Sequence, residues 1–191
     1  MLFNLPNQLT WARIVLIPLF IAIFYVPSWL TPAEANLAAT VLFVAAALTD
    51  WADGWLARKL GQTSAFGAFL DPVADKLMVA AALVVLVQLG RVDGVIAFII
   101  VGREITISAL REWMATIGAN KSVAVSMLGK LKTIVQMVAI PMLLYHDVLG
   151  PLDPQFVGTL LIYVAAFMTL WSMAYYLQKA WPIIRARANE P

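Results

Sequence analysis

Residues 50–75 read DWADGWLARKLGQTSAFGAFLDPVAD, and they carry four aspartates in a chain that is otherwise strongly apolar. An aspartate in or near a bilayer costs about 2.5–3.5 kcal/mol, and less near the interface. A chain that places Asp50, Asp53, Asp71 and Asp75 this close together therefore needs something that offsets the cost. Divalent metal is the expected answer, because the hard oxygen ligands of carboxylates suit Mg²⁺, Mn²⁺ or Ca²⁺.

The composition around this stretch is that of a membrane protein. The chain has 191 residues, of which 62% are hydrophobic and 13% charged, and its mean hydropathy is +0.85. Soluble chains are about 45–50% apolar and about 25% charged. We therefore predict an all-α integral membrane protein with one domain, residues 1–191. No cysteine is present, which excludes disulfides and thiolate chemistry, and no nucleic-acid partner is expected.

Six stretches are long and apolar enough for a transmembrane helix, which needs about 20 residues. After an interfacial lead-in at residues 1–10, they are residues 11–29, 33–57, 72–90, 93–114, 122–145 and 155–180. Lysine and arginine accumulate on the cytoplasmic side of membrane proteins. Of the 13 basic residues only Arg91 falls on the other side. We therefore predict that both termini and the aspartates lie on the cytoplasmic side.

The aspartates form two pairs with helical spacing. Asp50 and Asp53 are three residues apart at the end of the second helix, and Asp71 and Asp75 are four apart at the start of the third. Members of each pair therefore share a helix face, and the short loop between the helices brings the two faces together. Four converging carboxylates would repel one another, which again favours bound metal.

Simpler explanations stay open for single residues of this stretch. Asp71 can cap a helix that has Pro72 at its first position, Asp53 can belong to a turn with Gly54, and Arg58 can pair with a neighbouring aspartate. Three small residues either let a nucleotide approach the backbone or let two helices pack closely. They are Gly54, Ala57 and Gly67.

At every fixed position the stretch resembles the signature D-x2-D-G-x2-A-R-x8-G-x3-D-x3-D of the CDP-alcohol phosphotransferases. The resemblance implies that family's fold of six transmembrane helices, usually as a homodimer, and a cytosol-facing site with two divalent cations, Mg²⁺ or Mn²⁺. It implies metal ligands among the four aspartates and makes Asp75 the catalytic base. It also implies that the cytidine nucleotide is bound by Asp50, Asp53, Gly54, Ala57, Arg58 and Gly67.

Basic residues further along the chain indicate an anionic acceptor. Arg103 and Arg111 are eight residues apart, about two helical turns, so they face the same way. Lys130 and Lys132 lie in the fifth predicted span, and few acidic residues accompany these four cations. Such a group suits a phosphate-bearing acceptor. The alternative is the general cytoplasmic bias of basic residues, with side chains that reach lipid phosphates.

Residues 102–113 and 122–133 resemble the branch of this family that makes phosphatidylglycerophosphate. The resemblance implies a bacterial cytoplasmic-membrane enzyme that joins CDP-diacylglycerol and sn-glycerol 3-phosphate and releases CMP. It implies that Arg103, Arg111, Lys130 and Lys132 hold the acceptor phosphate, with Thr10 and Arg13 nearby. Three alternatives remain open, namely a cardiolipin synthase that uses phosphatidylglycerol as acceptor, a cation-coupled transporter and a non-catalytic scaffold. In a transporter, the carboxylates are expected near the bilayer midplane rather than at the inner ends of the helices.

Overall fold

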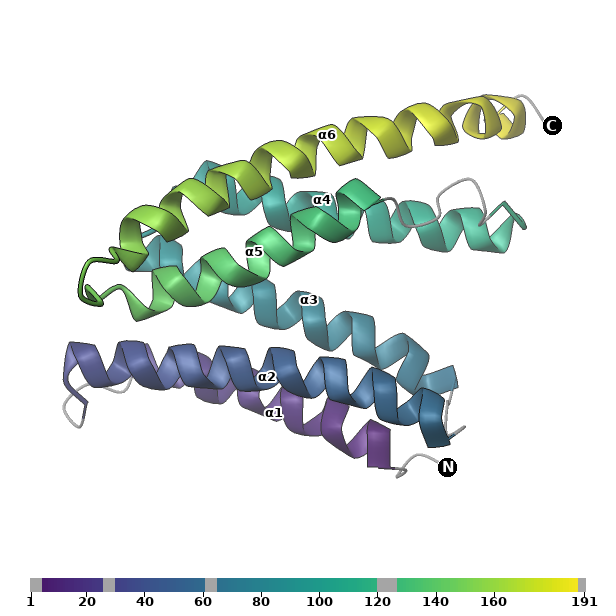
Figure 1. Ribbon diagram of the computed structural model, residues 1–191. Coiled ribbons are helices and arrows are strands. Elements are labelled where there is room, and N and C mark those ends of the chain that lie inside the picture. The colour runs from purple at the N-terminus through teal and green to yellow at the C-terminus, as the bar shows by residue number, and fades with distance from the viewer. Residues whose placement is uncertain (1–4, 26–29, 61–64, 120–126, 189–191) are drawn as a thin grey trace.

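A computed structural model describes residues 5–25, 30–60, 65–119 and 127–188, and these residues form six α-helices (Figure 1). The all-α prediction is therefore confirmed. The helices are α1 (Leu5–Tyr25), α2 (Pro32–Leu60), α3 (Ala65–Gln88), α4 (Gly94–Thr116), α5 (Met127–Tyr145) and α6 (Pro154–Ala188). The predicted homodimer stays a prediction, because the structure describes a single chain.

Some helix boundaries differ from the predicted spans. α1 begins at Leu5, so most of the predicted lead-in is helical, and α6 continues to Ala188. α3 begins at Ala65 rather than at residue 72, and Pro72 lies inside it. Pro72 is the eighth residue of α3, so it removes one internal hydrogen bond of the helix without ending it. Asp71 therefore lies within α3 and is not its N-cap.

α1 begins and α6 ends at the same end of the bundle (Figure 1). The end of α2, the start of α3 and the end of α4 lie there too, whereas the α5–α6 connection lies at the opposite end. This arrangement gathers the basic and acidic residues near those helix ends at one end of the molecule.

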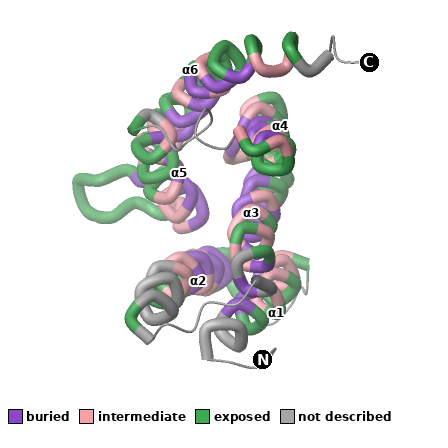
Figure 2. Tube along the Cα trace, turned by 90° about the vertical axis from the view of Figure 1, so that its right-hand side faces the viewer, coloured by how far each residue is buried: buried purple, intermediate pink, exposed green. Residues whose placement is uncertain are grey.

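α3 is the central helix, with α1 and α2 on one side and α4 on the other (Figure 2), and it contacts all four of α1, α2, α4 and α5. The main apolar core contains fully buried side chains from all six helices. They include Phe20, Phe43, Leu83, Leu86, Ile100, Leu143 and Ile162. A smaller core, built from Ile107 and Met114 of α4 with Tyr176 and Ala180 of α6, joins the two outer helices near the end where α6 finishes.

The outside of the bundle is also apolar. Large hydrophobic side chains such as Leu19, Val84 and Phe98 are more than half exposed, on three different helices. An apolar surface this extensive needs a cover other than water. In the part of the chain that the structure describes, the segments Pro32–Asp50 and Pro154–Ala186 are long and apolar enough to cross a bilayer. Both observations are in accord with the predicted membrane protein.

Arg91 stabilises the end of the bundle opposite to the one where α1 begins and α6 ends. Its guanidinium donates to the backbone carbonyls of Leu143 and Leu144, at 3.1 and 2.8 Å, and to Oδ1 of Asn36 at 2.8 Å. The two carbonyls belong to the last turn of α5, where a helix lacks internal donors and carries partial negative charge. Arg91 therefore links α2 and α5 to the connection between α3 and α4.

Candidate active site

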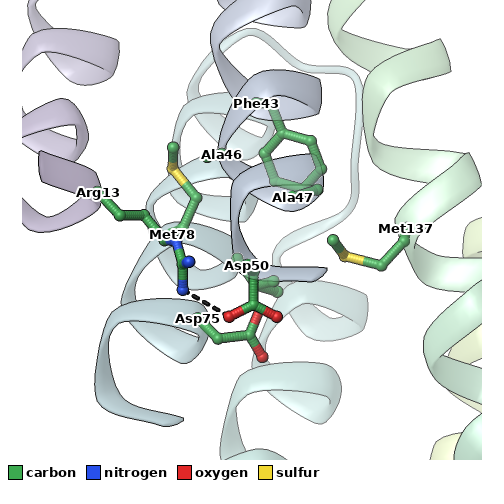
Figure 3. Close-up of a pocket in the computed structure, with 9 residues that line it drawn as sticks. Arg13, Phe43, Ala46, Ala47, Asp50, Asp75, Met78 and Met137 are labelled. Atoms are coloured by element: carbon green, nitrogen blue, oxygen red, sulfur yellow. Dashed lines mark hydrogen bonds and ion pairs between the residues drawn. The ribbon is translucent and has the colours of Figure 1, made fainter. Parts of the chain in front are cut away.

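Asp50 of α2 and Asp75 of α3 line one pocket, and Figure 3 shows their carboxylates close together. Arg13 of α1 lies in the same pocket, is 2% exposed, and donates from Nη1 to Oδ1 of Asp50 over 2.5 Å. We call this the aspartate pocket. Its other lining residues are Phe43, Ala46, Ala47, Met78, Val79 and Met137.

The half-buried carboxylate of Asp75 has no side-chain partner among the described residues. Within residues 5–25, 30–60, 65–119 and 127–188 it makes no hydrogen bond and no ion pair, whereas Asp50 is paired with Arg13. The aspartate pocket thus holds two carboxylates and one guanidinium. Asp75 is the carboxylate that remains available to a ligand or a proton.

The first helix contacts both aspartate-bearing helices. One turn before Arg13, the buried Thr10 donates from Oγ1 to Oδ1 of Asp71 over 2.5 Å. Thr10 and Arg13 therefore orient carboxylates that the sequence predicts as metal ligands. In this structure they lie with Asp71 and Asp50 rather than with the predicted acceptor-binding cations.

Several predicted nucleotide and metal residues lie outside the described side chains. Asp53, Gly54, Ala57 and Arg58 belong to the last part of α2, but their side chains are not described, and Gly67 is buried at the start of α3. No group of three or more acidic or histidine side chains that could hold a metal occurs among the described residues. The predicted two-cation site therefore stays a prediction.

A second pocket adjoins the first on the other side of Asp75. We call it the lysine pocket, because Lys132 of α5 lies in its wall with Glu104 of α4 and Gln136 of α5. Its remaining lining residues are Lys76, Val79, Thr133 and Met137. Asp75 lines both pockets, so a single carboxylate is accessible from both sides.

Glu104 connects two of the predicted acceptor-binding cations. Its Oε1 accepts a hydrogen bond from Nζ of Lys132, which is 2% exposed, and lies 3.4 Å from Nη1 of Arg103, which is 6% exposed. Buried cations need a counter-charge, and Glu104 supplies it in the absence of substrate. No role for Glu104 was predicted from the sequence. The available signal was the same as for the aspartates, a carboxylate inside an apolar helix.

Arg111 joins this group through α6, whereas Lys130 does not join it. The guanidinium carbons of Arg103 and Arg111 lie 5.7 and 5.2 Å from the ring centroid of Tyr176, so the two arginines do face the same way. Lys130 is exposed. Residues two apart on a helix point to nearly opposite sides, so Lys130 lies on a different face of α5 from the buried Lys132, and its role in acceptor binding stays a prediction.

Comparison with known proteins identifies the family of this chain. Residues 3–171 match the family described as CDP-alcohol phosphatidyltransferase. The chain belongs to this family of membrane-associated transferases, and the family predicted from residues 50–75 is confirmed.

Two curated relatives make the comparison more specific. The proteins named CDP-diacylglycerol--glycerol-3-phosphate 3-phosphatidyltransferase from Shigella flexneri serotype 5b (strain 8401) and Escherichia coli (strain K12) are each 48% identical to this chain over 182 residues. Each alignment covers 94% of this chain and 96% of the relative.

Proposed function

We propose that this chain transfers the phosphatidyl group of CDP-diacylglycerol to sn-glycerol 3-phosphate, which yields phosphatidylglycerophosphate and CMP. Relatives that are 48% identical over nearly the whole chain carry the name of this reaction. The structural observation that supports it best is the place of Asp75 between the aspartate pocket and the lysine pocket. One pocket suits a metal-bound diphosphate and the other suits an anionic acceptor.

Asp75 is the proposed catalytic base. A hydroxyl of the acceptor attacks the β-phosphorus of CDP-diacylglycerol, a new P–O bond forms, and the bond to the oxygen of CMP breaks. The hydroxyl must lose its proton during this step, and a carboxylate within reach can take it. Asp75 is suited to this task because it lines both pockets and its carboxylate forms no ion pair with the described residues.

The aspartates are the proposed ligands of two divalent cations, Mg²⁺ or Mn²⁺, with Asp50, Asp53 and Asp71 as the main ligands and Asp75 beside them. The donor set fits, because Asp50 and Asp75 offer hard oxygen atoms in a pocket where Arg13 is the one guanidinium among the described lining residues. When bound, such cations neutralise the phosphoryl oxygens and the leaving group. The hydrogen bonds from Arg13 and Thr10 hold Asp50 and Asp71 in place.

The nucleotide is proposed to lie along the end of α2 and the start of α3. Gly54, Ala57 and Gly67 leave room for a flat base or a phosphate near the backbone. Arg58 supplies a positive charge on the same helix. The end of α2 and the start of α3 lie at one end of the bundle, which suits a water-soluble product that must leave (Figure 1).

The acceptor phosphate is proposed to lie beside Lys132 and Arg103, with Arg111 further along α4. Both nearer cations are almost fully buried and share the single carboxylate of Glu104. Buried cations of this kind form strong charge-assisted hydrogen bonds to a phosphate group, which supports an anionic acceptor.

In the membrane, we propose six transmembrane helices with both termini and the site on the cytoplasmic side of a bacterial inner membrane, in a homodimer. The distribution of the 13 basic residues supports this orientation. The common end at which α1 begins and α6 finishes is in accord with it (Figure 1).

A direct assay tests the proposal. Protein purified in a neutral detergent is mixed with CDP-diacylglycerol and Mg²⁺ or Mn²⁺, and each acceptor is added separately while CMP is measured. We expect CMP release with sn-glycerol 3-phosphate and none with phosphatidylglycerol. Release with phosphatidylglycerol alone would identify the cardiolipin-forming reaction, and cation flux through vesicles without any CMP would point to a transporter.

A further inference from the structure

The face of α6 that packs against α4 carries buried polar side chains. Tyr176 is 1% exposed, and Ser172, one turn earlier, is fully buried. Nη2 of Arg103 donates to Oγ of Ser172 at 3.0 Å, and Nη2 of Arg111 donates to the hydroxyl of Tyr176 at 3.2 Å. The helices α4 and α6 are in contact along this face. α6 therefore provides a polar wall behind the two arginines.

The ring of Tyr176 brings together two side chains that start far apart. Arg103 and Arg111 are eight residues apart on α4, which corresponds to about 12 Å along the helix axis. Their guanidinium carbons nevertheless both lie within 5.7 Å of the same ring centroid. Two like charges repel, and the electron-rich face of an aromatic ring offsets part of that repulsion. Without this ring the two guanidiniums would separate.

The two arginines also retain unused donors. The Nε atoms of Arg103 and Arg111 are buried and have no hydrogen-bond partner within the described residues. A buried donor without a partner costs about 1–3 kcal/mol. Two such donors on neighbouring guanidiniums suit a ligand that has several acceptor oxygens, such as a phosphate.

We propose that Tyr176 is a positioning residue for the phosphate of the acceptor and acts through Arg103 and Arg111. Ser172 helps to position Arg103 by accepting its hydrogen bond. The inference rests on the proposed function, and it adds α6 to an acceptor site for which the sequence predicted no residue of that helix. Glu104 links the group to the lysine pocket, because it contacts Arg103 and also lines that pocket. Tyr176 itself need not touch the substrate.

Steady-state kinetics of paired tyrosine variants test the proposal. Y176F keeps the ring but loses the hydroxyl that accepts from Arg111, and we expect KM for sn-glycerol 3-phosphate to rise about 3- to 10-fold. Y176L loses the ring as well, and we expect a rise of about 30-fold or more. The KM for CDP-diacylglycerol and kcat should stay within about twofold, which a general loss of structure would not allow. Y175F and Y175L are the controls, because Tyr175 lies next in the chain and packs under Lys179 at 4.6 Å. Its ring also meets the ring of Tyr176 edge to face, at 5.9 Å between centroids, so Y175L reports the loss of this packing while Tyr176 is kept.

A second measurement uses inorganic phosphate as the probe, so it does not depend on turnover. We expect phosphate to raise the melting temperature of the wild-type protein and of both Tyr175 variants, but to have a reduced effect on Y176L. If the wild type releases no CMP with glycerol 3-phosphate, the proposed function fails, and this phosphate shift still decides the role of Tyr176.

Three results would overturn the proposal. The first is an unchanged acceptor KM in Y176L, or in Y176F if Y176L does not fold. The second is a rise in KM for CDP-diacylglycerol instead of the acceptor, which would mean that the arginines bind the lipid phosphate. The third is an equal effect of the Tyr175 and Tyr176 substitutions, which would mean that only the packing of α6 matters.

Discussion

Replacement of Lys132 by methionine should weaken binding of the acceptor and also lower the stability of the protein. Lys132 is 2% exposed, and its ammonium is bonded to Glu104, which is 24% exposed. A charge-assisted hydrogen bond to a phosphate contributes about 1.5–3 kcal/mol, so its loss in K132M should raise the KM for sn-glycerol 3-phosphate about 10- to 100-fold. Methionine keeps most of the volume of the lysine stem, so the apolar packing around it is largely retained.

The same substitution removes the nearest partner of Glu104. Removal of one partner of a buried ion pair lowers the free energy of unfolding by about 3–5 kcal/mol. The cost should be lower here, about 1–3 kcal/mol, because Glu104 is partly exposed and Arg103 still lies 3.4 Å from it. A second change, E104Q, removes the unpaired charge. The double variant E104Q/K132M should therefore regain stability without regaining acceptor affinity.

The assay combines CMP release at varied acceptor concentration with thermal unfolding in detergent. K130M is the matched control, because Lys130 is an exposed lysine of the same helix, and its acceptor KM should change less than about twofold. If K130M and K132M raised the acceptor KM equally, the idea that the buried Lys132 beside Glu104 binds the acceptor phosphate would be refuted. A double variant that is less stable than K132M would refute the assigned ion pair.

Three further predictions concern other parts of the molecule. D75N should fold and bind CDP-diacylglycerol but lose about 10²- to 10⁴-fold in the rate of CMP release, and near-normal turnover would remove Asp75 as the base. R91M should lower the free energy of unfolding by about 2 kcal/mol, and with it the melting temperature, because it removes the hydrogen bonds to the end of α5 and to Asn36. These bonds lie far from the site, so kcat should stay unchanged, and an altered kcat would contradict the prediction. G158A should destabilise the α5–α6 contact by about 1–3 kcal/mol, since a Cβ there would lie 2.8 Å from Cγ of Leu143, and an unchanged unfolding midpoint would show that the helices can shift freely.

The all-helical fold was predictable because the signal for it is local. Apolar runs separated by glycine and proline mark helices, and each run can be recognised without knowledge of its neighbours. The start of α3 was not predicted correctly, because Pro72 suggested a boundary that the preceding residues override. Local signals of this kind identify a helix more reliably than its ends.

The site was predictable only where its residues are close in sequence. The spacing of Asp50, Asp71 and Asp75 reveals which faces carry them, but contacts between helices are not encoded in spacing. The pairing of Thr10 with Asp71 joins residues far apart in the chain, and so does the link from Lys132 to Glu104. These contacts depend on how the helices pack, which single-sequence patterns do not contain.

The sharing of Asp75 by two pockets has a consequence for engineering. The walls of the aspartate pocket come mainly from α1, α2 and α3, whereas those of the lysine pocket come from α3, α4 and α5, with α6 behind them. Under the proposed function, donor activation and acceptor choice would thus belong to different segments of one chain. Chimeras that exchange the α4–α6 segment between relatives offer a modular route to new lipid headgroups while the catalytic half is left intact.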